Sequence, residues 1–385
     1  MSARAQTDRL RTPLHAASYA HGLHVAVCAL VLHASALGLT ATVPAYRQSV
    51  SVTAERVAQV VEQVRRGPLS DDAFAQALAL GYALIGEARY AEAERLFGAL
   101  AEKRPRDPAP VYAEALAVFN LGRVADAEPL ARRAAESALA EASRARGADE
   151  ERRQNAGAEE RRQNARAADT LVLLAVVLAV KGDDAGALKA ARQATALAPD
   201  SFDAQLTLGR ALYGAGDDAG ATRAFRAAVA LRPADAHALF FLATTLEHAG
   251  DADGALAAYR ELAAREPRGA EGHLGLGVLL VKRGGTETDE GMLELERALE
   301  INPDLYEARV TLGRVLVARG RAAEAVSHLN RAAQLAPGNP EPHYQLSLAY
   351  RRLGRKDDAA AETIIVKRIH EARRTGGNTP TPPKD

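Results

Sequence analysis

The sequence contains no tryptophan, a single cysteine and few aromatic residues, which make up 4% of its 385 residues. Because Cys28 has no second cysteine to pair with, an internal disulfide framework, a cysteine redox pair and a cysteine-based zinc site are excluded. The chain also lacks an excess of either charge, since 49 Lys and Arg residues balance 49 Asp and Glu residues. A chain without a basic excess has no electrostatic footprint for nucleic acid, so we expect no nucleic-acid partner.

Motifs for catalysis and cofactor binding are missing as well. The glycine-rich run at 284–291 lacks the Gly-Lys-Ser/Thr ending that a phosphate-binding loop requires. No Gly-x-Ser-x-Gly, His-Glu-x-x-His or zinc-deaminase motif occurs in the sequence. We therefore expect no enzyme activity, no cofactor and no metal site.

Residues 1–45 have the composition of a targeting segment. Three arginines within the first eleven residues precede an uncharged stretch, 12–46, whose apolar centre is 23–39. A basic start followed by an apolar centre is typical of a secretory signal, and Val43-Pro44-Ala45 offers a cleavage pattern. An uncleaved anchor also fits, because about 20 apolar residues span a bilayer. We expect a periplasmic or secreted protein, or one anchored in the inner membrane, with a cytoplasmic protein as the alternative.

A regular repeat organises most of the remaining chain, with a period of about 34 residues. Prolines recur at nearly equal intervals, at Pro199, Pro233, Pro267, Pro303 and Pro337. Glycines recur in the same register at Gly182, Gly216, Gly250, Gly284, Gly320 and Gly354. Abundant alanine favours helices over strands. A period of this length indicates stacked helix pairs, because one pair cannot bury its apolar face alone.

Each recurring residue type has an expected local role. The glycine ends the first helix of a pair in a left-handed conformation, and an aspartate after it caps the second helix. The proline is expected to open the following helix. Small residues at three further positions let the helix backbones approach closely.

With these small-residue, glycine and proline positions, the chain resembles the tetratricopeptide repeat family, in which each copy forms two antiparallel helices. The resemblance implies an all-α, right-handed superhelical solenoid of antiparallel helix pairs. Eight copies fit the register, at 74–107, 108–137, 168–201, 202–235, 236–269, 270–305, 306–339 and 340–373. The family's tryptophan position holds other residues throughout, and Gln205 and Arg309 at that position predict looser helix pairing in their copies.

The repeats and the segments between them divide the chain into six parts. These are a signal peptide or membrane anchor (1–45), an N-terminal capping helix (46–73), repeats 1–2 (74–137), a charged helical insertion (138–167), repeats 3–8 (168–373) and a disordered tail (374–385). The insertion contains the block EERRQNA twice, at 150–156 and 159–165. Because it is polar on all sides, we expect a protruding, solvated helical extension.

The resemblance also implies a concave groove, lined by the first helix of each copy at positions 2, 5, 9, 12 and 13. Aromatic and arginine side chains dominate the energetics of protein interfaces. Side chains of this kind at groove positions, with one histidine, are Tyr82, Tyr112, Phe119, Arg210, Tyr213, Phe240, His248, Arg314, Tyr344 and Arg351. Each of them could equally pack between adjacent repeats. Arg210 and Arg314 are the stronger candidates, because an unpaired arginine is costly to bury.

These observations predict a non-catalytic protein–protein interaction scaffold that binds a protein or peptide segment in the groove, in the bacterial cell envelope. The alternatives are a cytosolic adaptor and a regulatory or accessory subunit of an enzyme or assembly machine. Membrane contact is expected only through the N-terminal segment, if that segment is uncleaved. The apolar residues of the last helix, 355–373, form either a homodimer contact or ordinary packing.

Overall fold

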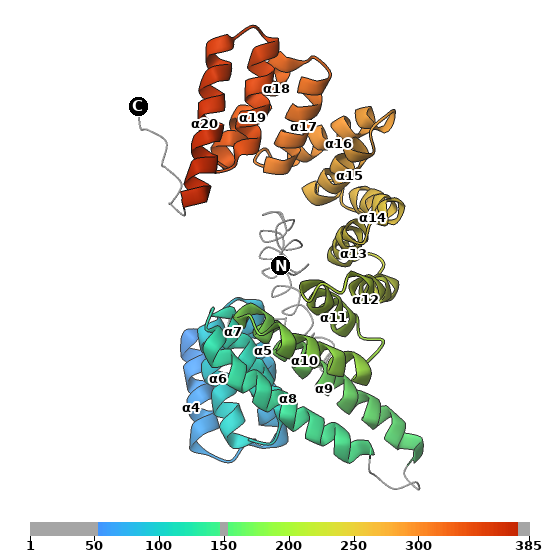
Figure 1. Cartoon of the computed structure of the whole chain (residues 1–385). Helices are drawn as coiled ribbons and strands as arrows, with labels where there is room; N and C mark the ends of the chain where they lie inside the picture. The colour runs from blue at the N-terminus through green and yellow to red at the C-terminus, as the bar shows by residue number, and fades with distance from the viewer. Residues whose placement is uncertain (1–52, 147–152, 376–385) are drawn as a thin grey trace. The chain divides into compact units, whose positions relative to one another are not determined.

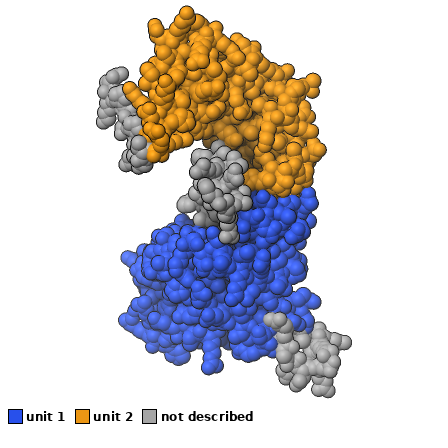
Figure 2. Space-filling model, in the orientation of Figure 1, with its two compact units in different colours: residues 1–233 blue, residues 234–385 orange. Residues whose placement is uncertain are grey.

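The computed structural model describes residues 53–146 and 153–375. These residues form 17 helices and no strand, so the predicted all-α stack of antiparallel helix pairs is confirmed (Figure 1). They belong to two compact units, residues 1–233 and 234–385 (Figure 2). The predicted targeting segment, 1–45, lies outside the described residues.

The first unit contains nine helices of the described chain, and its core runs through α4 to α11. The helices are α4 (Ala54–Arg66), α5 (Asp71–Gly86), α6 (Tyr90–Lys103), α7 (Pro108–Asn120), α8 (Val124–Arg146), α9 (Arg153–Lys181), α10 (Asp184–Leu197), α11 (Phe202–Gly214) and α12 (Asp218–Leu231). Four antiparallel pairs follow one another, α5 with α6, α7 with α8, α9 with α10 and α11 with α12. Helix α4 packs against α6.

The second unit contains four more pairs. They are α13 (Ala236–His248) with α14 (Ala252–Arg265), α15 (Ala270–Arg283) with α16 (Glu287–Ile301), α17 (Tyr306–Ala318) with α18 (Ala322–Leu335), and α19 (Pro340–Arg352) with α20 (Lys356–Thr375). Helix α20 continues to Thr375, two residues into the stretch predicted as the tail, and the rest of that stretch lies outside the described residues.

The turn inside each pair contains a residue in the left-handed conformation. Glycine adopts the left-handed conformation, as predicted, with φ between +74° and +87° at Gly122, Gly182, Gly216, Gly250, Gly284, Gly320 and Gly354. In three turns an aspartate follows and caps the second helix, as predicted. The carboxylates of Asp183, Asp217 and Asp251 accept a hydrogen bond from a backbone N–H three residues on, at 2.8–3.0 Å.

In four other turns an arginine stands in place of the capping aspartate, and in the turn before α16 Thr286 takes this position without capping the helix. Arg89, Arg123, Arg321 and Arg355 each pair with a carboxylate three residues later in the chain, at 2.6–2.8 Å. The turn before Arg89 also lacks the glycine. Ala88 takes its place, and among the described residues it is the only non-glycine residue with a positive φ, +58°.

The recurring prolines do not open the following helix, which corrects the prediction. Pro199 lies in a turn that ends α10, and the Ser201 N–H donates to the Ala198 carbonyl at 3.1 Å across it. Pro267 takes the same place between Glu266 and Gly269, which are joined at 2.8 Å. Proline favours the second position of such a turn, because its φ is preset and it has no N–H to leave unpaired.

The close approach of the two helices in a pair depends on matched side-chain sizes at facing positions. A Cβ on Gly81 would lie 2.4 Å from the ring of Phe97, and one on Gly209 would lie 2.6 Å from the ring of Phe225. Where the first helix has alanine instead, the corresponding residue of the second helix is alanine in the pairs Ala115/Ala131 and Ala175/Ala191 and tyrosine in the pair Ala243/Tyr259, and all six are buried. Gly81 and Gly209 therefore admit aromatic rings that an added Cβ would touch.

The position that holds tryptophan in the resembled family carries polar side chains in four of the eight copies. Gln205 and Arg309 donate to the carbonyls of Pro199 and Pro303, at 2.7 and 2.6 Å, six residues earlier in the chain. The histidines at this position instead pair with a glutamate of the second helix, His273 with Glu294 and His343 with Glu362, each at 2.6 Å. At these positions hydrogen bonds thus replace part of the apolar contact that a tryptophan side chain would make with its neighbours.

The insertion lengthens two paired helices. Residues 138–146 continue α8 and residues 153–167 begin α9, and the two helices pack against each other (Figure 1). The first EERRQNA block lies partly outside the described residues, whereas the second lies on α9. The stretch Gly157–Lys181 is long and apolar enough to cross a membrane, but 61% of its apolar window is buried inside the protein. Its apolar residues serve the core between α8 and α10.

Candidate functional site: the layer of first helices

The first helices of neighbouring pairs pack against one another within each unit. In the first unit α5 contacts α7, α7 contacts α9 and α9 contacts α11. In the second unit α13 contacts α15, α15 contacts α17 and α17 contacts α19. We call these two sets the inner layers. All ten groove residues predicted from the sequence lie on them.

Most of the predicted groove residues of the first unit are buried in its inner layer. Tyr112, Phe119 and Arg210 are 6–7% exposed, and Tyr82 and Tyr213 are half-buried. The ring of Tyr82 packs edge-on against the ring of Phe97, with 5.4 Å between centroids. These aromatic rings therefore form part of the packing between helices.

The predicted groove residues of the second unit are more exposed. His248, Arg314 and Arg351 are exposed, and Tyr344 is 50% exposed. Phe240 is half-buried, with its ring 5.8 Å from that of Phe241 in an edge-on arrangement. Arg314 and Tyr344 lie on α17 and α19, two inner helices in direct contact.

An acidic series on the inner layers is the feature that the sequence prediction missed. The second position of successive copies holds Asp169, Asp203, Glu271, Glu307 and Glu341, with His237 between the second and third. The spacing is that of the repeat, so the series was visible in the sequence. The prediction did not include these carboxylates, because it was based on aromatic and arginine side chains as interface anchors.

Asp169 is the member of this series with the most unusual surroundings in the first unit. Burial raises the pKa of its carboxyl group to about 7, and the neighbouring Asp203 adds to the shift. Asp169 makes no hydrogen bond or ion pair with another described residue, whereas Asp203 lies 3.6 Å from Arg232. The carboxyl group of Asp169 is therefore half-protonated near neutral pH.

Two tyrosines face the same carboxylates. Burial raises the pKa of Tyr112, and Asp169, Tyr82 and Asp203 raise it further. Burial also raises the pKa of Tyr82, with Asp107 and Asp169 as further causes and Arg166 opposing them. The Tyr82 hydroxyl is fully buried and has no hydrogen-bond partner among the described residues.

The second unit has a comparable carboxyl group on α17. Burial raises the pKa of Glu307 to about 7, Glu247 raises it further, and Arg314 opposes the shift. Tyr259 donates to Glu247 at 3.3 Å, and its hydroxyl lies 3.4 Å from that of Thr244. The buried tyrosine hydroxyl near Glu307 therefore has hydrogen-bond partners, whereas that of Tyr82 in the first unit has none among the described residues.

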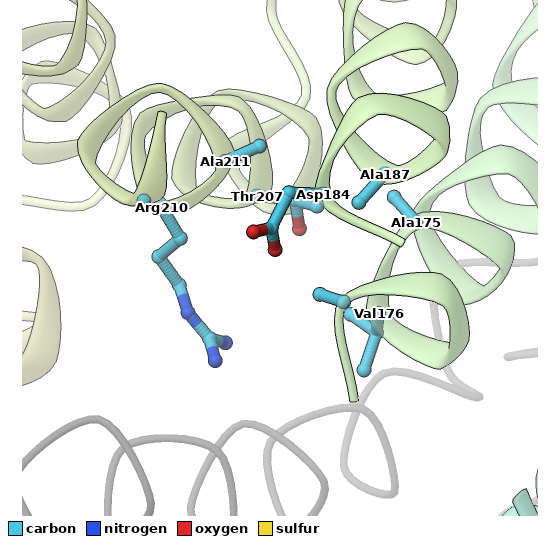
Figure 3. Close-up of a pocket in the computed structure, with 9 residues that line it drawn as sticks. Ala175, Val176, Asp184, Ala187, Thr207, Arg210 and Ala211 are labelled. Atoms are coloured by element: carbon cyan, nitrogen blue, oxygen red, sulfur yellow. The ribbon is translucent and has the colours of Figure 1, made fainter. Parts of the chain in front are cut away.

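A small pocket opens between α9, α10 and α11. Ala175, Val176, Ala187 and Ala211 form its apolar wall. Figure 3 shows the Asp184 carboxylate and the Arg210 side chain reaching toward the same opening, from the start of α10 and from α11. The described residues contain no group of three or more His, Cys, Asp or Glu side chains that could hold a metal ion. The pocket combines a mostly apolar wall with one carboxylate and one guanidinium group at its opening.

Comparison with known families gives matches along most of the described chain. A family model described as tetratricopeptide repeat matches residues 78–151, 206–265 and 249–306. A second model with the same description matches residues 316–364. No curated protein matches the chain.

Solved structures resemble the chain at low sequence identity. A chain of the APC/C hetero-tetramer Cut9–Hcn1 is 14% identical with a TM-score of 0.52, and the match covers 77% of this chain and 52% of that one. PilF of Pseudomonas aeruginosa is 18% identical with a TM-score of 0.48, over 54% of this chain and 94% of that one. YrrB, described as a TPR protein with an unusual peptide-binding site, is 18% identical with a TM-score of 0.41, over 49% and 95%. The first of these likenesses supports the fold alone.

Proposed function

Because the chain belongs to the tetratricopeptide repeat family, whose members are protein-interaction scaffolds, we propose that it holds a segment of a partner protein against its inner layers without catalysing a reaction. Members of this family are generally non-catalytic. Binding is mechanical in this proposal. Rigid helix pairs present a surface that is already formed, so little ordering entropy is lost when an extended segment docks.

The exposed anchors on α17 and α19 are the observation that supports this proposal most directly. Arg314, Tyr344 and Arg351 are exposed on two inner helices that touch each other, whereas the large apolar residues of those helices, such as Leu312, Leu316 and Leu346, are buried. Tyrosine and arginine are the residue types that carry binding energy when a partner covers them.

Photo-crosslinking tests where the partner binds. A photoreactive amino acid at Tyr344 is expected to capture one partner protein in living cells, and the captured species is identified by mass spectrometry. The same amino acid at Leu293, 56% exposed on the second helix α16, serves as the control. In an Arg314→Ala, Arg351→Ala background, capture at position 344 should fall at least tenfold. Equal capture at both positions, or capture unaffected by the two alanines, would contradict the proposal.

We also propose that the protein works outside the cytoplasm or anchored to the inner membrane. The basic start and uncharged apolar stretch of residues 1–46 support this location. Cell fractionation with an intact mass of the recovered protein tests it. A soluble periplasmic or secreted species lacking residues 1–45 is the expected result, and a full-length protein in the membrane fraction indicates an anchor. Recovery of the full-length protein from the cytosol would overturn the proposal and leave a cytosolic adaptor.

A homodimer through α20 is a further proposal. Ile364 is 51% exposed on this helix, whereas Ile369 is buried against the rest of the unit. The apolar residues of the helix are thus divided between packing and the surface.

A further inference from the structure

We propose that the inner layer of the first unit receives a basic side chain, a lysine or arginine of the partner segment, at a cluster formed by Tyr82, Tyr112, Asp169 and Asp203. We call these four residues the acidic tyrosine cluster. The inference rests on the proposed function, because it names the chemistry of the segment that the inner layer would hold. It goes beyond that function by assigning charge, residue type and position.

Four successive inner helices bring the cluster together. Tyr82 lies on α5, Tyr112 on α7, Asp169 on α9 and Asp203 on α11. Asp169, Tyr82 and Asp203 all lie near enough to Tyr112 to raise its pKa, and Asp169 also raises the pKa of Tyr82, so Tyr112 and Asp169 link the members of the cluster. The residues are far apart in sequence, and only the stacking of pairs places them side by side.

The polar groups of the cluster make few hydrogen bonds with the described residues. Tyr112 is only 7% exposed, yet its hydroxyl makes no hydrogen bond with another described residue. Within the same part of the chain, the buried hydroxyl of Tyr82 has no partner, and Asp169 makes no hydrogen bond or ion pair. Buried polar groups in native proteins are nearly always paired. Within the cluster, the Tyr82 hydroxyl is the buried polar atom without a partner among the described residues, and Tyr112 and the partly buried Asp169 add a hydroxyl and a carboxylate on the next two inner helices that a partner can engage.

The chemistry of these groups selects a cation. An ammonium group has three N–H donors, and the two tyrosine oxygens and the Asp169 carboxylate are three acceptors. Tyrosine rings also attract cations through their faces. An anion would be repelled by Asp169 and Asp203, and a metal ion would find too few ligands among the described residues. A lysine or arginine side chain meets every requirement.

The neighbouring charges leave room for one positive charge. Asp107, at the start of α7, contributes a further negative charge, while Arg166 on α9 and Arg232 after α12 contribute positive charges. Arg232 lies against Asp203, and no ion pair from the described part of the chain neutralises Asp169. Asp169 is therefore the carboxylate that a partner's basic residue would engage.

Binding of such a residue has a definite pH dependence. The pKa of Asp169 is raised to about 7, so the carboxyl group is neutral below pH 7 and charged above it. A cation binds the charged form, so affinity should rise as the pH increases from 6 to 8, by about tenfold, and about half a proton per site should be released on binding at pH 7, where the carboxyl group is half-protonated. A basic side chain would in turn lower this pKa, because an opposite charge favours the carboxylate.

An NMR titration of the full chain with labelled tyrosine rings tests the proposal. The probes are blocked hexapeptides of one alanine–serine background whose central residue is lysine, arginine, norleucine or glutamate. The lysine or arginine peptide should shift the signals of Tyr82 and Tyr112, assigned by Tyr82→Phe and Tyr112→Phe, and leave Tyr90 on the second helix α6 unchanged. Norleucine and glutamate peptides should leave all three signals unchanged.

Substitutions complete the test. Asp169→Asn should weaken binding of the basic peptide at least tenfold at pH 8 and remove the pH dependence. Asp200→Asn, the same change at an exposed aspartate in the turn before α11, should alter neither, and circular dichroism checks that both variants remain folded. Equal shifts with the norleucine peptide, or an Asp169→Asn variant that binds like the parent, would overturn the inference. In either case crosslinking at Tyr344 would still report on the proposed function, which can stand without this site.

Discussion

Replacing Gly272 with alanine is expected to lower the free energy of unfolding of the second unit by about 3 kcal/mol or more. The added Cβ would lie 2.7 Å from the backbone nitrogen and 2.9 Å from the Cα of Ala263, across the contact between α15 and α14. Backbone atoms cannot turn away as a flexible side chain can. The two helices must therefore separate, and the packing on both sides is lost.

Denaturant unfolding followed by circular dichroism measures this loss, and hydrogen exchange by mass spectrometry locates it in α14 and α15. Gly86→Ala is the matched control, since it adds the same methyl group at the end of α5 where nothing lies within 4 Å. That change should be neutral or stabilise the first unit by up to about 1 kcal/mol, because alanine has the higher helix propensity. If Gly272→Ala unfolds at the parental denaturant concentration, the close contact of α14 and α15 is wrong.

Truncating Phe225 to alanine is expected to destabilise the first unit by about 3–5 kcal/mol. Phe225 is fully buried, and its ring fills the space that the missing side chain of Gly209 leaves on the opposite helix. The truncation therefore removes buried apolar surface and opens a cavity between α11 and α12. Thermal or denaturant unfolding measures the effect.

A second substitution, at Gly209, tests whether the sizes of the side chains at positions 209 and 225 are matched. In the parent, Gly209→Ala should be destabilising, because its Cβ would lie 2.6 Å from the ring of Phe225. In the Phe225→Ala background the same change should be stabilising, since it recreates the alanine pairs seen at Ala115/Ala131 and Ala175/Ala191. We therefore predict that the effect of Gly209→Ala on the free energy of unfolding changes sign between the two backgrounds. An effect of Gly209→Ala with the same sign in both backgrounds would mean that the two residues are not coupled.

The recurring features of the fold could be predicted because each has a local cause. The left-handed glycines and the capping aspartates depend only on backbone geometry within a few residues, and the structure has them at the predicted places. The prediction for Pro199 and the other recurring prolines was wrong, because these prolines lie in the turn that precedes the helix. Proline fits both a turn and the first turn of a helix, and the sequence alone does not choose between them.

The candidate site was harder to predict, because it depends on contacts between pairs. The sequence placed Tyr82 and Tyr112 on the correct helices, but their burial follows from how tightly α5, α7 and α9 pack. The raised pKa of Asp169 likewise comes from burial and from Asp203, which lies one repeat further along the chain. The spacing of the acidic series could be seen in the sequence, whereas the burial of its carboxyl groups and the charges near them could not.

The turn between α5 and α6 makes one part of the chain sensitive to ionic strength. Ala88 holds a left-handed conformation that costs about 1–2 kcal/mol for an L-residue. Beside it, Arg89 forms ion pairs with Glu87 at 3.1 Å and with Glu92 at 2.7 Å. Dissolved salt screens partly exposed pairs of this kind, whereas it leaves the conformational freedom of glycine untouched. The turns at Arg123, Arg321 and Arg355 have a similar ion pair but also a left-handed glycine, which the turn before Arg89 lacks. Raising the ionic strength should therefore loosen the turn between α5 and α6 before the turns that contain glycine.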